Sequence, residues 1–212
     1  MTARYAVYYA PARDSLLWHR AQHWLVQPDL ETLTVSARRY GFHATIRAPM
    51  TLSLEPDDLD AALSELMLEH RAVALTGLAP RMLEGFLALT MEPQPKPVTD
   101  LAASVVKALE PLRAPLSADE RERRLRAPLT PRQIELVDEY GYPYVLDEFL
   151  FHMTLTDRLP EDRREEMVGR ATEWFADALS EPIRLDRLVV FEEPEPGAAF
   201  VRRDPDYVLM GA

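Results

Sequence analysis

The chain has 212 residues, a formal net charge of −11 at pH 7, 47% hydrophobic and 28% charged residues, and no cysteine. This length suits one domain, and the acidic balance disfavours a protein that binds long nucleic acid without sequence preference. The missing thiols exclude disulfides, thiolate ligands and a cysteine nucleophile. No apolar run reaches the roughly 18 residues of a membrane span, and the N-terminus is too polar after Tyr9 for a secretory signal, so we expect a cytoplasmic protein.

The first half of the chain mixes strand and helix patterns. The expected elements are a strand over 4–10, a helix from Asp14 to about Val26, a strand within 34–51, a helix opened by Glu55 to Asp57, strands over 72–78 and 85–91 joined by a loop around Arg81, a Pro-rich connector over 92–96, and a helix over 99–112. In the helix after Asp57, Leu59 and Leu63 share one apolar face.

The second half repeats this mixture. It predicts a short exposed helix over 117–126, a helix from Thr130 to Gly141, a strand over 148–158, a helix over 162–179, and final strands over 183–192 and 198–209 joined by a turn at Pro194–Gly197. On the long helix, Met167, Trp174, Phe175 and Leu179 are core candidates. Neighbouring strands with hairpins between helices predict an α+β fold with antiparallel sheets.

Two short segments share the pattern Phe-His-x-Thr. The first lies in YGFHATIRAP, Tyr40 to Pro49, and the second in FLFHMTLTDRL, Phe149 to Leu159, about half the chain apart. Residues i and i+2 of a strand point to the same face. In the first segment this places His43, Thr45 and Arg47 on one face, opposite an apolar face of Phe42, Ala44 and Ile46.

The second segment obeys the same alternation. Its polar face carries His152, Thr154, Thr156 and Arg158, and its apolar face carries Phe151, Met153 and Leu155. Each strand therefore buries one face and offers imidazole, hydroxyl and guanidinium groups on the other. We expect two related lobes within one domain spanning residues 1–212, each contributing one motif strand, at about 41–49 and 149–158.

This pair of motifs resembles the two-histidine (2H) phosphoesterases, which include the RNA ligase-like 2′,3′-cyclic phosphodiesterases. The segment from Tyr40 to Pro49 and the run from Gly141 to Leu159 look like a bacterial subgroup associated with phosphonate metabolism. The resemblance implies a bilobal, pseudo-symmetric α+β fold, in which two antiparallel sheets face a central cleft with helices packed outside. It also implies metal-independent chemistry on cyclic or mixed phosphodiesters, without a cofactor.

The residue types agree with that chemistry. One neutral imidazole can take a proton from water while the other, as imidazolium, protonates the departing ester oxygen. Thr45 and Thr154 are predicted to donate hydrogen bonds to the phosphate, and Arg47 to add a charge-assisted bond. The sequence leaves open whether His43 or His152 is the acid.

Further candidates for substrate binding flank the motif strands. They are Tyr40, Tyr142, Tyr144, Thr156 and Arg158, with packing or surface ion pairing as the alternative for each. Tyr8 or Tyr9 could also face the cleft from the first strand, and alternation alone does not choose between them. No glycine-rich phosphate loop is present, so side chains must hold the phosphate.

The other histidines favour structural interpretations. His19 and His23 have a spacing that can bind metal, but the metalloprotease pattern and a third ligand are missing, so we expect an exposed helix and no metal site. His70 is expected at a helix end, near the last carbonyls.

The sequence thus predicts a hydrolase for a small cyclic phosphodiester on a ribose or nucleotide, in phosphonate metabolism by family association. The alternatives are an RNA 2′,3′-cyclic phosphodiesterase and a non-catalytic phosphoribosyl-binding protein. A small phosphorylated sugar or nucleotide is the expected partner; long nucleic acid and membranes are not, and the oligomeric state is open.

Overall fold

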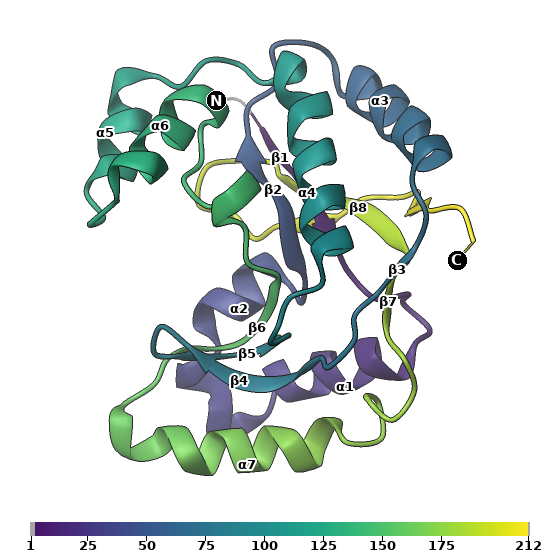
Figure 1. Cartoon of the computed structure of the whole chain (residues 1–212). Coiled ribbons are helices and arrows are strands. Elements are labelled where there is room, and N and C mark those ends of the chain that lie inside the picture. Colours follow the sequence, from purple (N-terminus) through teal and green to yellow (C-terminus); the bar gives the residue numbers. More distant parts are fainter. Residues whose placement is uncertain (1–2, 212) are drawn as a thin grey trace.

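The computed structural model describes residues 3–211 and is dominated by one antiparallel sheet (Figure 1). Its strands are β1 (Arg4–Tyr9), β2 (Ala44–Met50), β4 (Ala79–Leu83), β5 (Phe86–Thr90), β6 (His152–Arg158), β8 (Arg187–Glu193), β9 (Val201–Arg202) and β10 (Tyr207–Val208). Within the described residues the strand order is β10-β8-β1-β2-β6-β5-β4, with β9 paired to β8. A small second sheet pairs β3 (Val73–Ala74) with β7 (Arg184–Leu185).

The helices connect these strands and cover the sheet. They are α1 (Leu16–Leu25), α2 (Val35–Tyr40), α3 (Pro56–Glu69), α4 (Lys96–Leu109), α5 (Ala118–Leu125), α6 (Pro131–Tyr140) and α7 (Arg164–Phe175), with 3₁₀ turns η1 (Pro28–Leu33), η2 (Glu110–Leu112), η3 (Leu146–Glu148) and η4 (Glu161–Arg163). Their ends follow the expected chemistry. Ser117 and Thr130 form capping boxes for α5 and α6, and Gly141 ends α6 in the left-handed conformation.

The main sheet consists of two halves that meet at the motif strands. β1 and β2 pair at four positions, as do β5 and β6, whereas β2 and β6 pair only at Ala44 and Met153. Helix α4 packs beside β2, whereas α7 packs beside β4 and β5 (Figure 1). The predicted α+β class with antiparallel sheets is confirmed, and the two halves are continuous through this single pairing.

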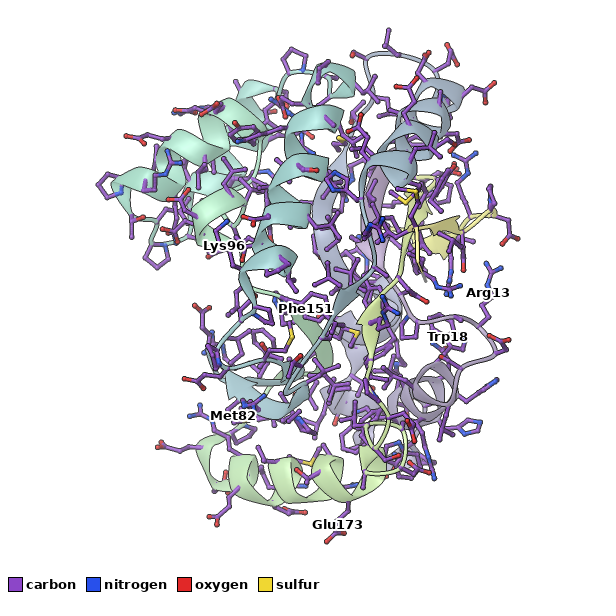
Figure 2. All side chains as sticks on the ribbon, turned by 45° about the vertical axis from the view of Figure 1, so that its right-hand side comes forward. Arg13, Trp18, Met82, Lys96, Phe151 and Glu173 are labelled. Carbon is purple, nitrogen blue, oxygen red and sulfur yellow. The ribbon has the colours of Figure 1, made fainter. Side chains whose placement is uncertain are left out.

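The apolar faces of both motif strands lie in the core. Phe42 and Ile46 are at most 2% exposed on one side of the junction, and Phe151 and Met153 are fully buried on the other. Figure 2 shows Phe151 in the interior, where strands and helices surround it. The alternation predicted for the apolar residues is therefore correct, and it fixes which side of each strand remains for the site.

The region between α3 and α4 differs from the expectation. Arg81 lies in the middle of β4 and not in a loop, and only Val73–Ala74 of the expected strand over 72–78 forms a strand. The Arg81 Nη1 donates to the carbonyl of Thr90 across the β4–β5 hairpin, which holds this charged residue within the strand. The helix α2 was not predicted, and α1 begins after its capping residue Ser15 and not at Asp14.

Within residues 3–211, none of the helices combines the length and the apolar character that crossing a membrane would require.

Candidate active site

The junction of β2 and β6 brings the two motifs together. Ala44 and Met153 are direct partners in this antiparallel pair, and both side chains are buried. In an antiparallel pair the residues on either side of such a position also face one another, with Cα atoms about 5 Å apart. Each motif histidine is therefore set opposite the threonine of the other motif. The facing pairs are His43 with Thr154 and His152 with Thr45.

Backbone hydrogen bonding fixes the ring of His43. Its Nδ1 lies 2.8 Å from the carbonyl oxygen of Gly41, which can only accept, so this nitrogen carries the proton. The ring stacks on Tyr8, with centroids 3.7 Å apart and planes inclined by 17°. The Nε2 lies 3.1 Å from Oγ1 of Thr45 and is left as the proton acceptor.

The second histidine is held in the same way. The Nδ1 of His152 lies 2.8 Å from the carbonyl oxygen of Leu150, again two residues upstream, so its Nε2 is also the basic nitrogen. The ring of Phe86 packs near it, at 5.7 Å between centroids. The two motifs thus present their imidazoles in the same tautomer, with Nε2 of each ring as the proton-accepting nitrogen.

Burial makes both rings weak bases. It lowers the pKa of His43 to about 4, against the opposing hydrogen bond to Gly41 and with a smaller contribution from repulsion by His152. Burial also lowers the pKa of His152, opposed by the carbonyl of Leu150 and by the carboxylate of Glu84. Of the two rings, His152 is the one beside a carboxylate that favours its charged form, that of Glu84.

A cavity of about 420 Å³ opens beside His152 and Thr45. Its lining also includes Leu83, Glu84, Phe86, Gln133, Tyr142, Tyr144, Glu148, Phe149 and Leu150. Tyr142 and Tyr144, both sequence candidates, meet edge to face with their centroids 5.6 Å apart. The volume lies within the range of about 300–1,000 Å³ common for small-molecule sites.

Of the first-strand tyrosines, Tyr8 belongs to the site. Tyr8 stacks on His43, whereas Tyr9 packs on Phe151 in the core, with 5.9 Å between ring centroids. Tyr40 is placed differently from Tyr142 and Tyr144. Its ring packs against Phe200, with 5.1 Å between centroids, and it does not line the cavity beside His152.

Glu84 is a site residue that sequence reasoning missed. It occupies a two-residue turn with Gly85 between β4 and β5, and both residues have positive φ, 48° and 95°. Such turns favour Asn or Asp before Gly, so a glutamate here is strained. The Glu-Gly pair between two apolar runs was the sequence signal for this turn, but only the tertiary fold brings it to His152.

Two predicted site residues, Arg47 and Thr156, do not line the cavity beside His152. Arg47 is 1% exposed, and its Nη2 donates to Oε2 of Glu110 at 2.6 Å. Thr156 is fully buried, and its hydroxyl oxygen accepts from the Leu87 backbone N–H at 3.0 Å. The register of β5 on β6 shifts between Thr154 and Arg158. Because of this irregularity, Thr156 does not follow the simple alternation that would place it beside Thr154 on the cleft face.

Arg158 is exposed at the end of β6, beside the Glu84–Gly85 turn. A Cβ on Gly85 would lie 2.8 Å from its Nη1. The side chain therefore covers the turn and does not line the cavity beside His152.

The remaining histidines lie outside this cleft. His19 and His23 are exposed on α1, as expected. His70 caps α3 as predicted, but its Nε2 lies 2.5 Å from Oγ of Ser104 and so bonds a neighbouring helix. In the part of the chain from 3 to 211, no three His, Cys, Asp or Glu side chains are grouped so that they could hold a metal ion.

Comparison with known families gives one match that covers more than half of the chain. The family model described as "Protein of unknown function (DUF1045)" matches residues 45–201. This range contains the second motif and begins at the threonine of the first.

Two curated relatives carry the same name, ribose 1,5-bisphosphate phosphokinase PhnN. The protein from Janthinobacterium sp. (strain Marseille) is 34% identical over 93% of this chain, and that from Laribacter hongkongensis (strain HLHK9) is 35% identical over 93%. The chain spans about half the length of these relatives, 49% and 50%.

Among solved structures, E. coli LigT in complex with 3′-AMP aligns over 99% of both chains. The TM-score is 0.47 and the sequence identity is 11%.

Proposed function

The chain belongs to the DUF1045 family, and we propose that its two motif histidines hydrolyse a small cyclic phosphodiester without a metal ion. The observation that carries this proposal is the repeated support of the two rings. Each Nδ1 is held by the carbonyl two residues upstream, and the β2–β6 pairing faces the two motifs across one junction. The chain resembles the 2H phosphoesterases in this pair of strands.

The proposed reaction is the attack of water on phosphorus. The attacking oxygen gives its proton to one Nε2 as the new P–O bond forms, and the other Nε2–H protonates the ester oxygen as the ring bond breaks. The products are a ring-opened phosphate monoester and a free hydroxyl. Thr45 and Thr154 donate to the non-bridging oxygens, where negative charge grows in the transition state.

We assign the base to His43 and the acid to His152. His43 lies against the Tyr8 ring without a carboxylate neighbour that favours its cation, so its neutral form suits proton acceptance. Glu84 favours the cation of His152, and the negative charge of a bound phosphodiester adds to that preference. The two roles thus follow from different neighbours around similar rings.

The name of the two relatives supports a phosphoribosyl substrate. It names ribose 1,5-bisphosphate, a phosphorylated ribose, as the compound on which those proteins act. We do not extend the kinase activity to this chain, which covers half of each relative and contains no glycine-rich phosphate loop. A ribose cyclic phosphate formed in phosphonate metabolism is the proposed substrate.

The test is turnover in the presence of a chelator on a small panel. The panel contains 5-phosphoribosyl 1,2-cyclic phosphate, nucleoside 2′,3′-cyclic monophosphates and a short RNA ending in a 2′,3′-cyclic phosphate. Opening of a small cyclic ester supports the proposal, and preference for the RNA end would assign the alternative substrate. Tight binding without turnover of any member would identify a phosphoribosyl-binding protein and overturn the hydrolase.

A further inference from the structure

A second, smaller cavity adjoins the histidine cleft. Its volume is about 200 Å³, and it shares Tyr142 with the larger cavity. Four arginines from separate parts of the chain line it: Arg4, Arg47, Arg113 and Arg124. Such a concentration of guanidinium groups is unexpected in a protein with a net charge of −11. We call this cavity the arginine pocket.

The carboxylates around the arginine pocket do not balance its positive charge. Arg47 and Arg113 share one carboxylate, that of Glu110, with the Arg113 Nη2 at 2.5 Å from Oε1. Arg4 bonds Glu193, at 2.5 Å, but that carboxylate also binds Arg39, at 2.8 Å.

Glu120 is the acidic residue among the lining side chains. Its carboxylate accepts from the backbone N–H and the hydroxyl of Ser117 in the capping box of α5. These neutral donors leave its negative charge in place. Glu110, Glu120 and Glu193 thus set three negative charges against the four lining arginines and Arg39, so positive charge remains in excess.

Two of the arginines have unused hydrogen-bonding capacity. The Nη1 of Arg47 is buried and has no hydrogen-bond partner among residues 3–211. Arg124 has no carboxylate within 4.0 Å in that same part of the chain, and its guanidinium lies 5.4 Å from the ring centre of Tyr142. Burial lowers the pKa of both side chains, a cost that an anion in the pocket would offset.

The arginine pocket lies within reach of a ligand held by the histidines. Thr45 lines the larger cavity and Arg47 the arginine pocket, and they are two residues apart on β2. At about 3.4 Å per strand residue this is a separation of about 7 Å along the strand. Tyr142 borders both cavities, so one small molecule can place a group in each.

We propose that the arginine pocket binds a second phosphate group of the substrate, a monoester separate from the cyclic ester that is opened. A phosphate monoester carries about −1.5 to −2 charges at pH 7, which matches the excess of guanidinium groups, and arginine forks bind its oxygens in pairs. This inference rests on the proposed function and narrows it to cyclic esters of sugars that also carry a terminal phosphate.

Arg124 is the variant of choice because its removal leaves no buried carboxylate unpaired. The kinetic test compares ribose 1,2-cyclic phosphate with and without a 5-phosphate, in wild type, Arg124→Gln and Arg124→Lys. Arg124→Gln is expected to reduce the ratio of kcat/KM values, phosphorylated over unphosphorylated substrate, by at least about tenfold. Arg124→Lys keeps the charge but not the forked guanidinium. Its ratio is expected to lie between those of wild type and Arg124→Gln. The control is Arg126→Gln, which removes an exposed charge at the end of α5.

An unchanged ratio in Arg124→Gln would overturn the proposal. A binding measurement keeps the result independent of turnover: calorimetric titration with ribose 5-phosphate, with ribose as the blank. Saturable binding that Arg124→Gln weakens about tenfold, and that Arg126→Gln leaves unchanged, supports the second phosphate site. This holds even if no cyclic ester is hydrolysed, and in that case only the proposed function fails. Absence of binding, or binding insensitive to Arg124→Gln, contradicts the second phosphate site.

Discussion

At the scale of single residues, the roles that we propose for the two histidines depend on the backbone around them. Each ring donates its Nδ1–H to the carbonyl oxygen of the residue two positions upstream in the chain. This bond selects the tautomer and leaves Nε2 for chemistry. The neighbouring residues then give the two rings different properties, because Tyr8 stacks on His43 and Glu84 lies near His152.

Replacing either motif histidine should remove activity without removing the fold. We expect His43→Ala and His152→Ala each to lower kcat by about 100-fold or more on the cyclic ester that wild type opens, since positioned proton transfer contributes about 10²–10⁴-fold. Steady-state kinetics with a melting curve for each variant checks this. His23→Ala on exposed α1 is the matched control. A variant of either motif histidine with wild-type kcat would contradict the pairing.

The half-buried ring of His43 should also make stability depend on pH. Its pKa falls from an ordinary 6.5 to about 4 in the fold, so the unfolded chain binds the proton more readily. The contribution to the free energy of unfolding is complete above about pH 6.5 and is lost as the pH falls toward 4, with a slope of at most about 1.4 kcal/mol per pH unit.

Urea unfolding at pH 7 and pH 4.5, in wild type and His43→Asn, measures this contribution. The free energy of unfolding should fall less in the variant than in wild type over this range. Equal losses in both proteins would show that His43 titrates normally in the fold.

At the scale of elements, irregular strands decide which polar residues reach the site. The register of β1 on β2 shifts twice, and that of β5 on β6 shifts once. Such irregularities turn side chains away from simple alternation. They accompany the burial of Thr156 and the enclosure of Arg47, both of which the sequence pattern placed on the cleft face.

Thr156 should behave as a structural residue. Thr156→Val keeps the shape but removes the acceptor of the buried Leu87 N–H, which should cost about 1–3 kcal/mol of the free energy of unfolding. Chemical denaturation measures the loss. Thr156→Ser, which restores the hydroxyl, should recover most of it. If Thr156→Val is as stable as wild type but binds substrate more weakly, Thr156 contacts the substrate and is not only structural.

The β4–β5 turn should show a trade between stability and activity. Glu84→Asn creates the Asn-Gly pair that this turn favours, so the melting temperature should rise, by an amount corresponding to up to about 1 kcal/mol. The same change removes the carboxylate that favours the His152 cation. The pH–rate profile should therefore lose activity at its alkaline side at a lower pH than in wild type. An unchanged profile would show that Glu84 does not act on His152.

At the scale of the whole molecule, the sequence predicted what depends on local pattern. The alternation in the motif strands identified Phe42, Ile46, Phe151 and Met153 as core, and Thr130 and Gly141 marked the ends of α6. These features follow from periodicities that a strand or helix imposes on neighbouring residues.

What depends on distant parts of the chain could not be predicted. The arginine pocket draws Arg4 from β1, Arg47 from β2, Arg113 from the segment after η2 and Arg124 from α5, and no sequence spacing relates them. The meeting of the two sheet halves rests on the single pair of Ala44 with Met153. The arginine pocket and the β2–β6 junction are both products of tertiary packing, and the proposed site needs the two to lie side by side.

The most direct measurement is ³¹P NMR of a ribose cyclic phosphate incubated with the protein in H₂¹⁸O and excess chelator. We expect wild type to open the ring and to place one solvent ¹⁸O on phosphorus, seen as an isotope shift of the product resonance. We expect neither ring opening nor this shift with His43→Ala or His152→Ala. Ring opening that persists in both variants, or that stops when chelator is added to wild type, would contradict a reaction driven by the two histidines.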